Sequence, residues 1–205
     1  MKITTDTTIY ARQSTIPLNI PDSISIVGCG GVGSWLAMYA AMVGVKNIYL
    51  YDSDTVEEHN LNRLPFPKDS VTKKKTEVMK DIILSMRDEC MVICKESLSP
   101  EFFSELLVSE IVIDCTDDYP FQIAISKWCT AHKLPYIKAG YDGPHITITS
   151  TIPEWDANPE DTNHYNTPPT PSFVVPASLV ASLVLTSILY KVPFEFSFNI
   201  HELKV

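Results

Sequence analysis

The sequence lacks the features of a membrane protein, a disulfide scaffold or a nucleic-acid binder. Its longest apolar stretch, residues 174–190, is shorter than the ~20 residues of a bilayer span and contains Pro176, so we expect a buried helix. Residues 1–13 hold no apolar signal core, and the five cysteines form no Cys-x-x-Cys pair, which favours a reducing, cytoplasmic setting without structural zinc. Only 16 basic residues stand against 25 acidic ones, which disfavours direct nucleic-acid binding.

Short apolar strands alternate with segments of helical period up to about residue 140. This alternation predicts a Rossmann-like α/β fold with a mostly parallel sheet and helices on both faces. Beyond it, residues 145–152 and 193–200 alternate apolar and polar side chains, so we expect antiparallel strands that extend the sheet. We expect residues 1–205 to form a single domain with a long, proline-rich surface loop at 153–172. The other expected strands are 23–28, 46–54, 90–96, 110–118 and 134–140, and the expected helices are 34–44, 74–89, 99–109, 119–133 and 174–190.

A glycine-rich turn follows the first expected strand. Gly28, Gly30, Gly31 and Gly33 open a helix, a spacing that lets a backbone approach a phosphate group. Asp52 ends the next strand, where it can accept hydrogen bonds from ribose hydroxyls. These features alone fit NAD as well as ATP, so an NAD(P)-dependent oxidoreductase is one alternative, although no Tyr-x-x-x-Lys pair supplies a proton donor.

The residues after Asp52 favour ATP over NAD. Residues 63–80 contain six of the 16 basic residues, and such a cluster can stabilise the charge that grows on departing pyrophosphate. The expected strand 110–118 ends in acidic residues, at the edge where open α/β sheets bind ligands, and a carboxylate there can hold Mg²⁺. Together these features indicate an adenylylation site. The acidic residues are Asp114, Asp117 and Asp118.

Five motifs occur in an order that resembles the ThiF/MoeB/HesA family of ubiquitin-activating-type adenylyltransferases. They are YARQ, GCGGVG, YDSDTVEEHNLNR, DCTDD and GYDGPHITI, spread over residues 8–150. The resemblance implies ATP- and Mg²⁺-dependent adenylylation of a carboxylate. It further implies that the substrate is the C-terminal glycine of a ubiquitin-like or sulfur-carrier protein, or a peptide, and that the enzyme is a homodimer.

The same resemblance implies individual roles for the motif residues. Asp52 would bind ribose, and Asp54 would belong to the same nucleotide-binding motif with the four glycines. Lys75 is preferred over Lys73 and Lys74 because a Thr–Glu pair follows it. The remaining roles are phosphate contacts by Asn60, Arg63 and Lys75, Mg²⁺ binding by Asp117, and a phosphate contact by Arg12 from the partner subunit.

Two departures from the family pattern bear on the reaction. No cysteine follows Cys129, so the 153–172 loop cannot offer a thiol, and we expect the reaction to stop at the acyl-adenylate. Leu64 stands where many relatives have Gln, and residues 139–190 contain no Lys or Arg. A noncatalytic scaffold that keeps the fold is therefore a second alternative.

Overall fold

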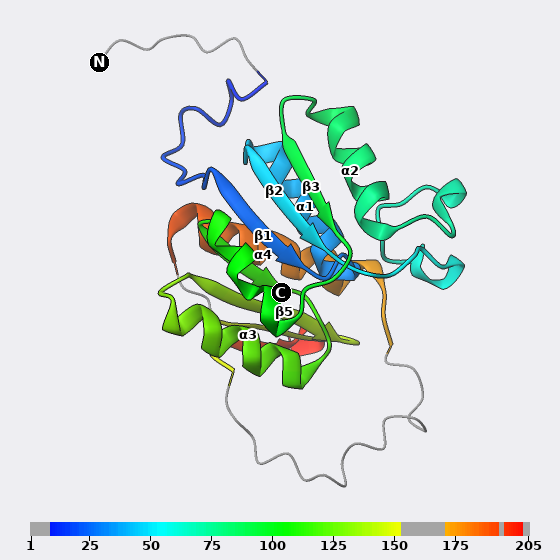
Figure 1. Ribbon diagram of the computed structural model, residues 1–205. Coiled ribbons are helices and arrows are strands. Elements are labelled where there is room, and N and C mark those ends of the chain that lie inside the picture. Colours follow the sequence, from blue (N-terminus) through cyan, green and yellow to red (C-terminus); the bar gives the residue numbers. More distant parts are fainter. Residues whose placement is uncertain (1–8, 153–170, 193–194, 203–205) are drawn as a thin grey trace, which may run out of the picture.

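The computed structural model of the protein describes residues 9–152, 171–192 and 195–202 (Figure 1). One seven-stranded sheet has the order β3-β2-β1-β4-β5-β6-β7. The first five strands in this order run parallel, and β6 pairs antiparallel with both β5 and β7. The strands are β1 (Ser23–Val27), β2 (Asn47–Tyr51), β3 (Met91–Lys95), β4 (Ile111–Asp114), β5 (Tyr136–Asp142), β6 (His145–Thr149) and β7 (Phe196–Asn199).

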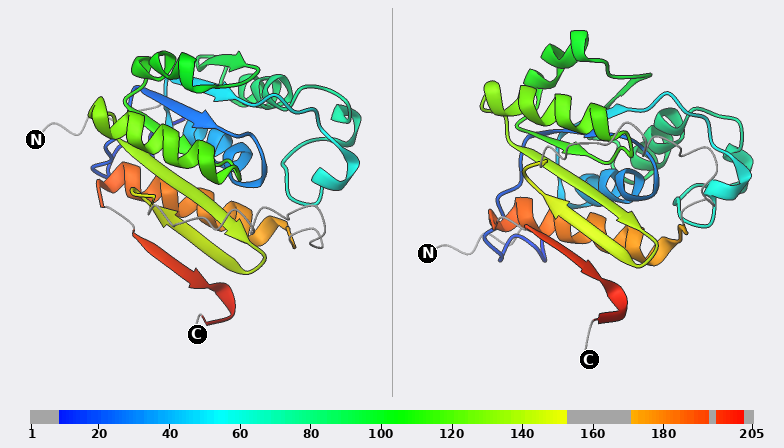
Figure 2. Two further views of the ribbon diagram at one scale, coloured as in Figure 1. Left: turned by 60° about the horizontal axis from the view of Figure 1, so that its bottom comes forward. Right: turned by 90° about the horizontal axis from the view of Figure 1, so that it is seen from below.

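Helices cover both faces of the sheet, as the alternation of elements predicts. One core joins the sheet to α1, α2 and α4, and the second core joins the opposite face to η3 and α3. The two views of Figure 2 show α3 and α4 on opposite sides of β5. The Rossmann-like fold with its antiparallel extension is thus confirmed. The helices are α1 (Gly31–Val43), α2 (Lys75–Met86), η3 (Pro100–Val108), α3 (Tyr119–Ala131) and α4 (Val174–Tyr190), with short 3₁₀ turns at Glu58–Asn60, Lys68–Ser70 and Ile200–Glu202.

Two expected elements differ in detail from the structure. The helix expected at 99–109 is a 3₁₀ helix, η3, in which the inward-facing Phe103 and Leu106 are three residues apart, the period of a 3₁₀ turn. The loop expected at 153–172 lies outside the described residues, apart from residues 171 and 172.

The apolar stretch at 174–190 is a buried helix, α4, packed against α1 and the sheet. Its buried side chains include Val180, Val184 and Leu185. Within the described ranges, no helix has both the length and the hydrophobicity needed to cross a membrane.

The glycine turn between β1 and α1 depends on two glycines for different reasons. Gly28 has a φ of +91°, and a Cβ there would lie 3.0 Å from the carbonyl oxygen of Cys115. A Cβ on Gly33 would lie only 1.9 Å from the carbonyl oxygen of Gly28, so the first turn of α1 packs directly on the strand end. At Gly30, by contrast, no atom lies within 4 Å of an added Cβ.

This difference predicts that alanine is costly at one glycine of the motif and nearly neutral at another. Gly33→Ala should lower the free energy of unfolding by about 3 kcal/mol, because backbone must move to admit the methyl group. Gly30→Ala, where φ is −79°, should change it by less than about 0.5 kcal/mol. Urea unfolding of both variants checks this, and equal stabilities would contradict the packing described for Gly33.

Candidate functional site

The carboxyl ends of β1, β2 and β4 meet at one edge of the sheet. Val27 is in register with both Tyr51 and Asp114, so the residues that follow these three converge. They are the glycine turn, Asp52 and the turn from Cys115 to Asp118. The chain continues to opposite sides of β1 from here, which is the topological switch point where open α/β sheets bind ligands.

Asp52 ties the glycine turn to the end of β2. One carboxylate oxygen accepts a hydrogen bond from the amide of Cys29 at 2.7 Å, and the other accepts from the amide of Asp54 at 2.8 Å. A carboxylate offers about four lone-pair positions, so each oxygen can still accept from a ribose hydroxyl. Asp52 therefore has a structural role that the ribose prediction did not include.

The first turn of α1 is open to an anion. Its N-cap is Gly30, which supplies no side-chain hydrogen bond, and the turn contains no acidic residue. The first amides of an α-helix have no partner inside the helix, and their dipoles favour negative charge. No atom lies within 4 Å of a Cβ added at Gly30, whereas a Cβ added at Gly31 would lie 2.6 Å from the Tyr141 hydroxyl, so the turn is uncovered on the Gly30 side.

The structure separates the three consecutive lysines. Lys73 is exposed, and the ammonium of Lys74 donates to the carbonyl oxygen of Ser53 at 2.7 Å. Lys75 begins α2 with a side chain only 11% exposed, and its ammonium lies 2.7 Å from a carboxylate oxygen of Asp54. Lys75 is thus a buried partner of the motif's second acid, not a solvated helix start. Its predicted phosphate contact requires that a ligand share the ammonium with Asp54.

Arg63 lies on the loop after β2 and is anchored to α1, because its carbonyl oxygen accepts a hydrogen bond from the Trp35 indole at 2.8 Å. Its guanidinium donates to the carbonyl oxygen of His59 and to the side chain of Asn62, at 2.9 and 3.1 Å. Both acceptors are neutral, and no carboxylate of the described residues pairs with the guanidinium. The charge of Arg63 is therefore available to an anion.

Asn60 is buried, and its side-chain oxygen accepts from the amide of Glu57 at 3.1 Å. In the reciprocal bond, the Glu57 carboxylate accepts from the backbone amide of Asn60, which completes a capping box around the turn before Arg63. The residue therefore shapes the loop that carries Arg63. Its predicted phosphate contact stays a prediction.

The three acids after β4 have different surroundings. Asp114 is fully buried, and its carboxylate accepts from the amide and hydroxyl of Thr116 and from the phenol of Tyr136. Asp118 caps α3 by accepting from the amide of Phe121 at 3.1 Å. Asp117, between them, is exposed.

Asp117 is consequently the acid of this turn that fits Mg²⁺. No group of three His, Cys, Asp or Glu side chains converges in the parts of the chain that are described. Mg²⁺ usually takes one or two protein carboxylates and completes its shell with water and substrate phosphates, so a single exposed carboxylate beside a phosphate site fits this ion.

Arg12 is the one predicted site residue that the fold places elsewhere. It is exposed in the turn around residues 9–16, where Gln13 donates to the carbonyl oxygen of Val43 at 2.8 Å and Tyr10 faces Gly44. This is the C-terminal end of α1, and 13 residues of helix separate it from the glycine turn, about 18 Å. Within one chain, Arg12 and the glycine turn do not meet.

All five cysteines are free, and burial raises the pKa of each thiol. For Cys115, beside the acidic turn, burial raises the pKa to about 12. Thiolates are the reactive form of cysteine, and at neutral pH these thiols stay protonated. The raised pKa values agree with a packing role for Cys29 and Cys115.

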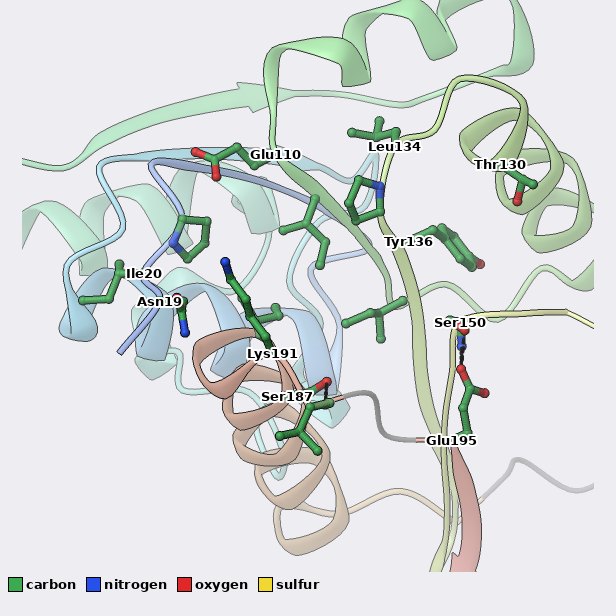
Figure 3. Close-up of a pocket in the computed structure, with 16 residues that line it drawn as sticks. Asn19, Ile20, Glu110, Thr130, Leu134, Tyr136, Ser150, Ser187, Lys191 and Glu195 are labelled. Carbon is green, nitrogen blue, oxygen red and sulfur yellow. Dashed lines mark hydrogen bonds between the residues drawn. The ribbon is translucent and has the colours of Figure 1, made fainter. Parts of the chain in front are cut away.

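A cavity of about 650 Å³ lies at the opposite edge of the sheet, and no sequence motif indicated it (Figure 3). Ile111 and Tyr136 at the amino ends of β4 and β5 line it, together with Lys191 after α4. Glu195 faces Ser150 on its wall; burial opposes ionisation of Glu195, but hydrogen bonds from Ser150 and Thr149 outweigh it and lower the pKa. Segments distant in sequence build this cavity, so no local motif could have predicted it.

The fold and the candidate site together define an α/β protein with a Rossmann-type sheet and a glycine turn at its switch point. The ThiF family model matches residues 21–189, and the chain belongs to the ThiF family.

Two curated relatives and one solved structure illustrate the similarity. The chain is 34% identical over 124 residues to tRNA threonylcarbamoyladenosine dehydratase of Haemophilus influenzae, which covers 58% of this chain and 48% of the relative. It is 31% identical over 117 residues to molybdopterin-synthase adenylyltransferase of Escherichia coli, covering 56% and 47%. The chain spans about half the length of the curated relatives it matches. The crystal structure of E. coli MccB with selenomethionine MccA superposes with a TM-score of 0.81 at 21% identity, over 97% of this chain and 70% of that one, a likeness of fold.

The buried thiol of the glycine turn predicts a pH dependence of stability. Burial raises the pKa of Cys29 well above its ordinary value, whereas in the unfolded chain a thiol ionises near pH ~8.5. Above that pH the unfolded chain releases a proton that the folded protein keeps, so stability falls by up to about 1.4 kcal/mol per pH unit. Urea unfolding at three pH values between 7 and 10 should give a shallower decline for Cys29→Ala than for the wild type. Equal slopes would contradict the buried, neutral thiol.

Proposed function

We propose that this protein adenylylates a substrate carboxylate with ATP. The observation that carries the proposal is the guanidinium of Arg63, which is held by neutral acceptors on a loop anchored to α1. Hydride transfer builds no new charge on the cofactor's phosphates, whereas the departure of pyrophosphate does, and a cation beside the phosphates stabilises that charge. The names of relatives such as molybdopterin-synthase adenylyltransferase support the same reaction.

In this reaction a carboxylate oxygen attacks the α-phosphorus of ATP. The new oxygen–phosphorus bond forms as the bond to the β-phosphate breaks, and pyrophosphate leaves with the electron pair. No proton has to move, so the protein acts mainly by positioning and charge neutralisation. Asp52 orients the ribose, the first amides of α1 hold phosphate oxygens, and Arg63 and Lys75 neutralise the leaving group.

Asp117 would hold Mg²⁺ in this scheme. The ion would supply charge neutralisation for the phosphate oxygens when bound. The hydrogen bonds of Asp114 and Thr116 fix the turn that presents Asp117, so the carboxylate would be in place before the ion arrives.

The reaction would end at the acyl-adenylate. The pKa of every cysteine is raised by burial, and none follows Cys129, so no thiolate of this chain is available to accept the acyl group at neutral pH. We propose that another molecule takes the acyl group. A ubiquitin-like or sulfur-carrier protein, or a peptide, would supply the carboxylate.

A homodimer would complete the site. Arg12 lies at the far end of α1 from its own glycine turn, so the phosphate contact implied by the family would come from a second copy. We further propose that residues 1–205 act as one adenylation domain in the cytoplasm.

A noncatalytic binding subunit is the second candidate. The ion pair of Lys75 with Asp54 favours it, because this cation is already neutralised in the protein without ligand. Such a subunit would bind nucleotide or a partner protein without releasing pyrophosphate.

Ligand-induced stabilisation tests the proposed nucleotide. Mg-ATP at ~100 times its dissociation constant should add about 2.7 kcal/mol to the free energy of unfolding, and Asp117→Asn should reduce this gain. NAD should add nothing. Stabilisation by NAD alone would contradict the proposal and favour an oxidoreductase.

Arg63 gives a second test, in binding of α,β-methylene-ATP with Mg²⁺. Arg63→Ala should weaken binding by about 10- to 100-fold, the worth of a hydrogen bond to a charged group. Arg87→Ala is the matched control, because that guanidinium lies 5.9 Å from the Tyr10 ring centre at the far end of α1. Equal losses in the two variants, measured by calorimetry, would overturn the role of Arg63.

A further inference from the structure

Lys138 lies on β5, beside the turn from Cys115 to Asp118, and has no role in the reaction described so far. It is in register with Asp114 of β4, and its ammonium donates to the carbonyl oxygen of Thr116, the residue before Asp117. Gln122 of α3 donates to the same carbonyl at 2.7 Å. The side chain is partly buried, so its charge is only partly hydrated.

The charge of Lys138 is not used by the described part of the chain. No carboxylate there lies within salt-bridge distance of its ammonium. Asp114 on the neighbouring strand β4 and Glu195, just before β7, instead accept from neutral donors: Thr116 and Tyr136 in the first case, Thr149 and Ser150 in the second. An ammonium has three donors, and the carbonyl of Thr116 accepts from one of them.

Strand order places Lys138 on a particular side of the proposed nucleotide. Ribose and phosphates would lie over β2, β1 and β4, where Asp52, the glycine turn and Asp117 end their strands. These strands are spaced ~4.8 Å apart, so β5 is the next position beyond the Mg²⁺ acid. The second reactant must approach the α-phosphorus from outside the nucleotide, and β5 is the adjoining part of the sheet edge.

Lys138 is the last basic residue before a long stretch of sequence that has none. Residues 139–190, which include the rest of β5, β6 and α4, contain no Lys or Arg. Asp142, exposed at the end of β5, repels an incoming carboxylate. The Lys138 side chain lies across Gly140, where a Cβ would be in van der Waals contact with the ammonium nitrogen at 3.5 Å.

We propose that Lys138 binds the carboxylate that is adenylylated. Its ammonium holds the oxygen that does not attack, and so aims the other oxygen at the α-phosphorus. That held oxygen becomes the carbonyl oxygen of the acyl-adenylate, and Lys138 stays protonated throughout. The inference rests on the proposed function and adds the residue that recognises the acyl substrate.

Three adenosine probes separate the acyl contact from the phosphate contact. One is an acyl-adenylate mimic, 5′-O-[N-(acetylglycyl)sulfamoyl]adenosine, which carries a glycine carbonyl at the reacting position. The others, AMP and 5′-O-sulfamoyladenosine, carry no acyl group. Calorimetry with the full chain gives the affinity for each.

Lys138→Met should weaken binding of the acyl mimic by about 10-fold or more, the worth of one charge-assisted hydrogen bond. Binding of AMP and sulfamoyladenosine should change by less than about 2-fold. Lys133→Met is the matched control, because Lys133 is exposed and precedes the amino end of the same strand. It should leave all three affinities unchanged.

Other results would overturn the inference in distinguishable ways. Equal losses for all three probes would mean that Lys138 only supports the Asp117 turn, and a loss confined to AMP would assign it to the phosphate. Unchanged affinities for all three probes would show that Lys138 has no role in binding. If Lys138→Met does not fold, Lys138→Gln gives the same comparison. A wild-type protein that binds none of the probes would instead contradict the proposed function.

Discussion

The close backbone contact inside the glycine turn is the constraint on which the rest of the site depends. Gly33 brings α1 against the carbonyl oxygen of Gly28, and Gly28 in turn abuts the backbone of Cys115. The amide of Cys29 then meets the carboxylate of Asp52. Three strand ends are thus fixed to one another by backbone and one acid, before any ligand binds. Positions held in this way can stabilise a transition state without reorganising.

The charged side chains around the glycine turn differ in whether they are already paired with an opposite charge. Lys75 is buried and paired with Asp54, whereas Arg63 and Lys138 donate only to neutral oxygens in the described residues. The acids divide similarly, because Asp114 is saturated by three donors and Asp117 is exposed. The unsatisfied groups are the ones that a nucleotide, a metal ion and a carboxylate would complete. This division between structural and available charge is the main electrostatic feature of the site.

The sequence predicted the fold well where one physical signal dominates. Helix α4 spans the whole apolar stretch Val174–Tyr190, and β1 coincides with a β-branched buried run. It did not predict that η3 is a 3₁₀ helix, because helical period alone does not separate short helix types. The pairing of Lys75 with Asp54 could not be predicted, because it depends on a tertiary contact: a bridge between Thr55 and Lys74 brings the two segments together. Lys138 belongs to no motif, and its position follows only from the register of β4 and β5.

The most direct measurement is a crystal structure of the protein with Mg²⁺ and α,β-methylene-ATP. We expect the ribose at Asp52, the phosphates between the first turn of α1 and Arg63, and the metal ion at Asp117. Arg12 of a second copy should approach the phosphates. A nucleotide bound in the cavity lined by Lys191 and Glu195, or a glycine turn with no ligand under saturating conditions, would contradict this nucleotide site.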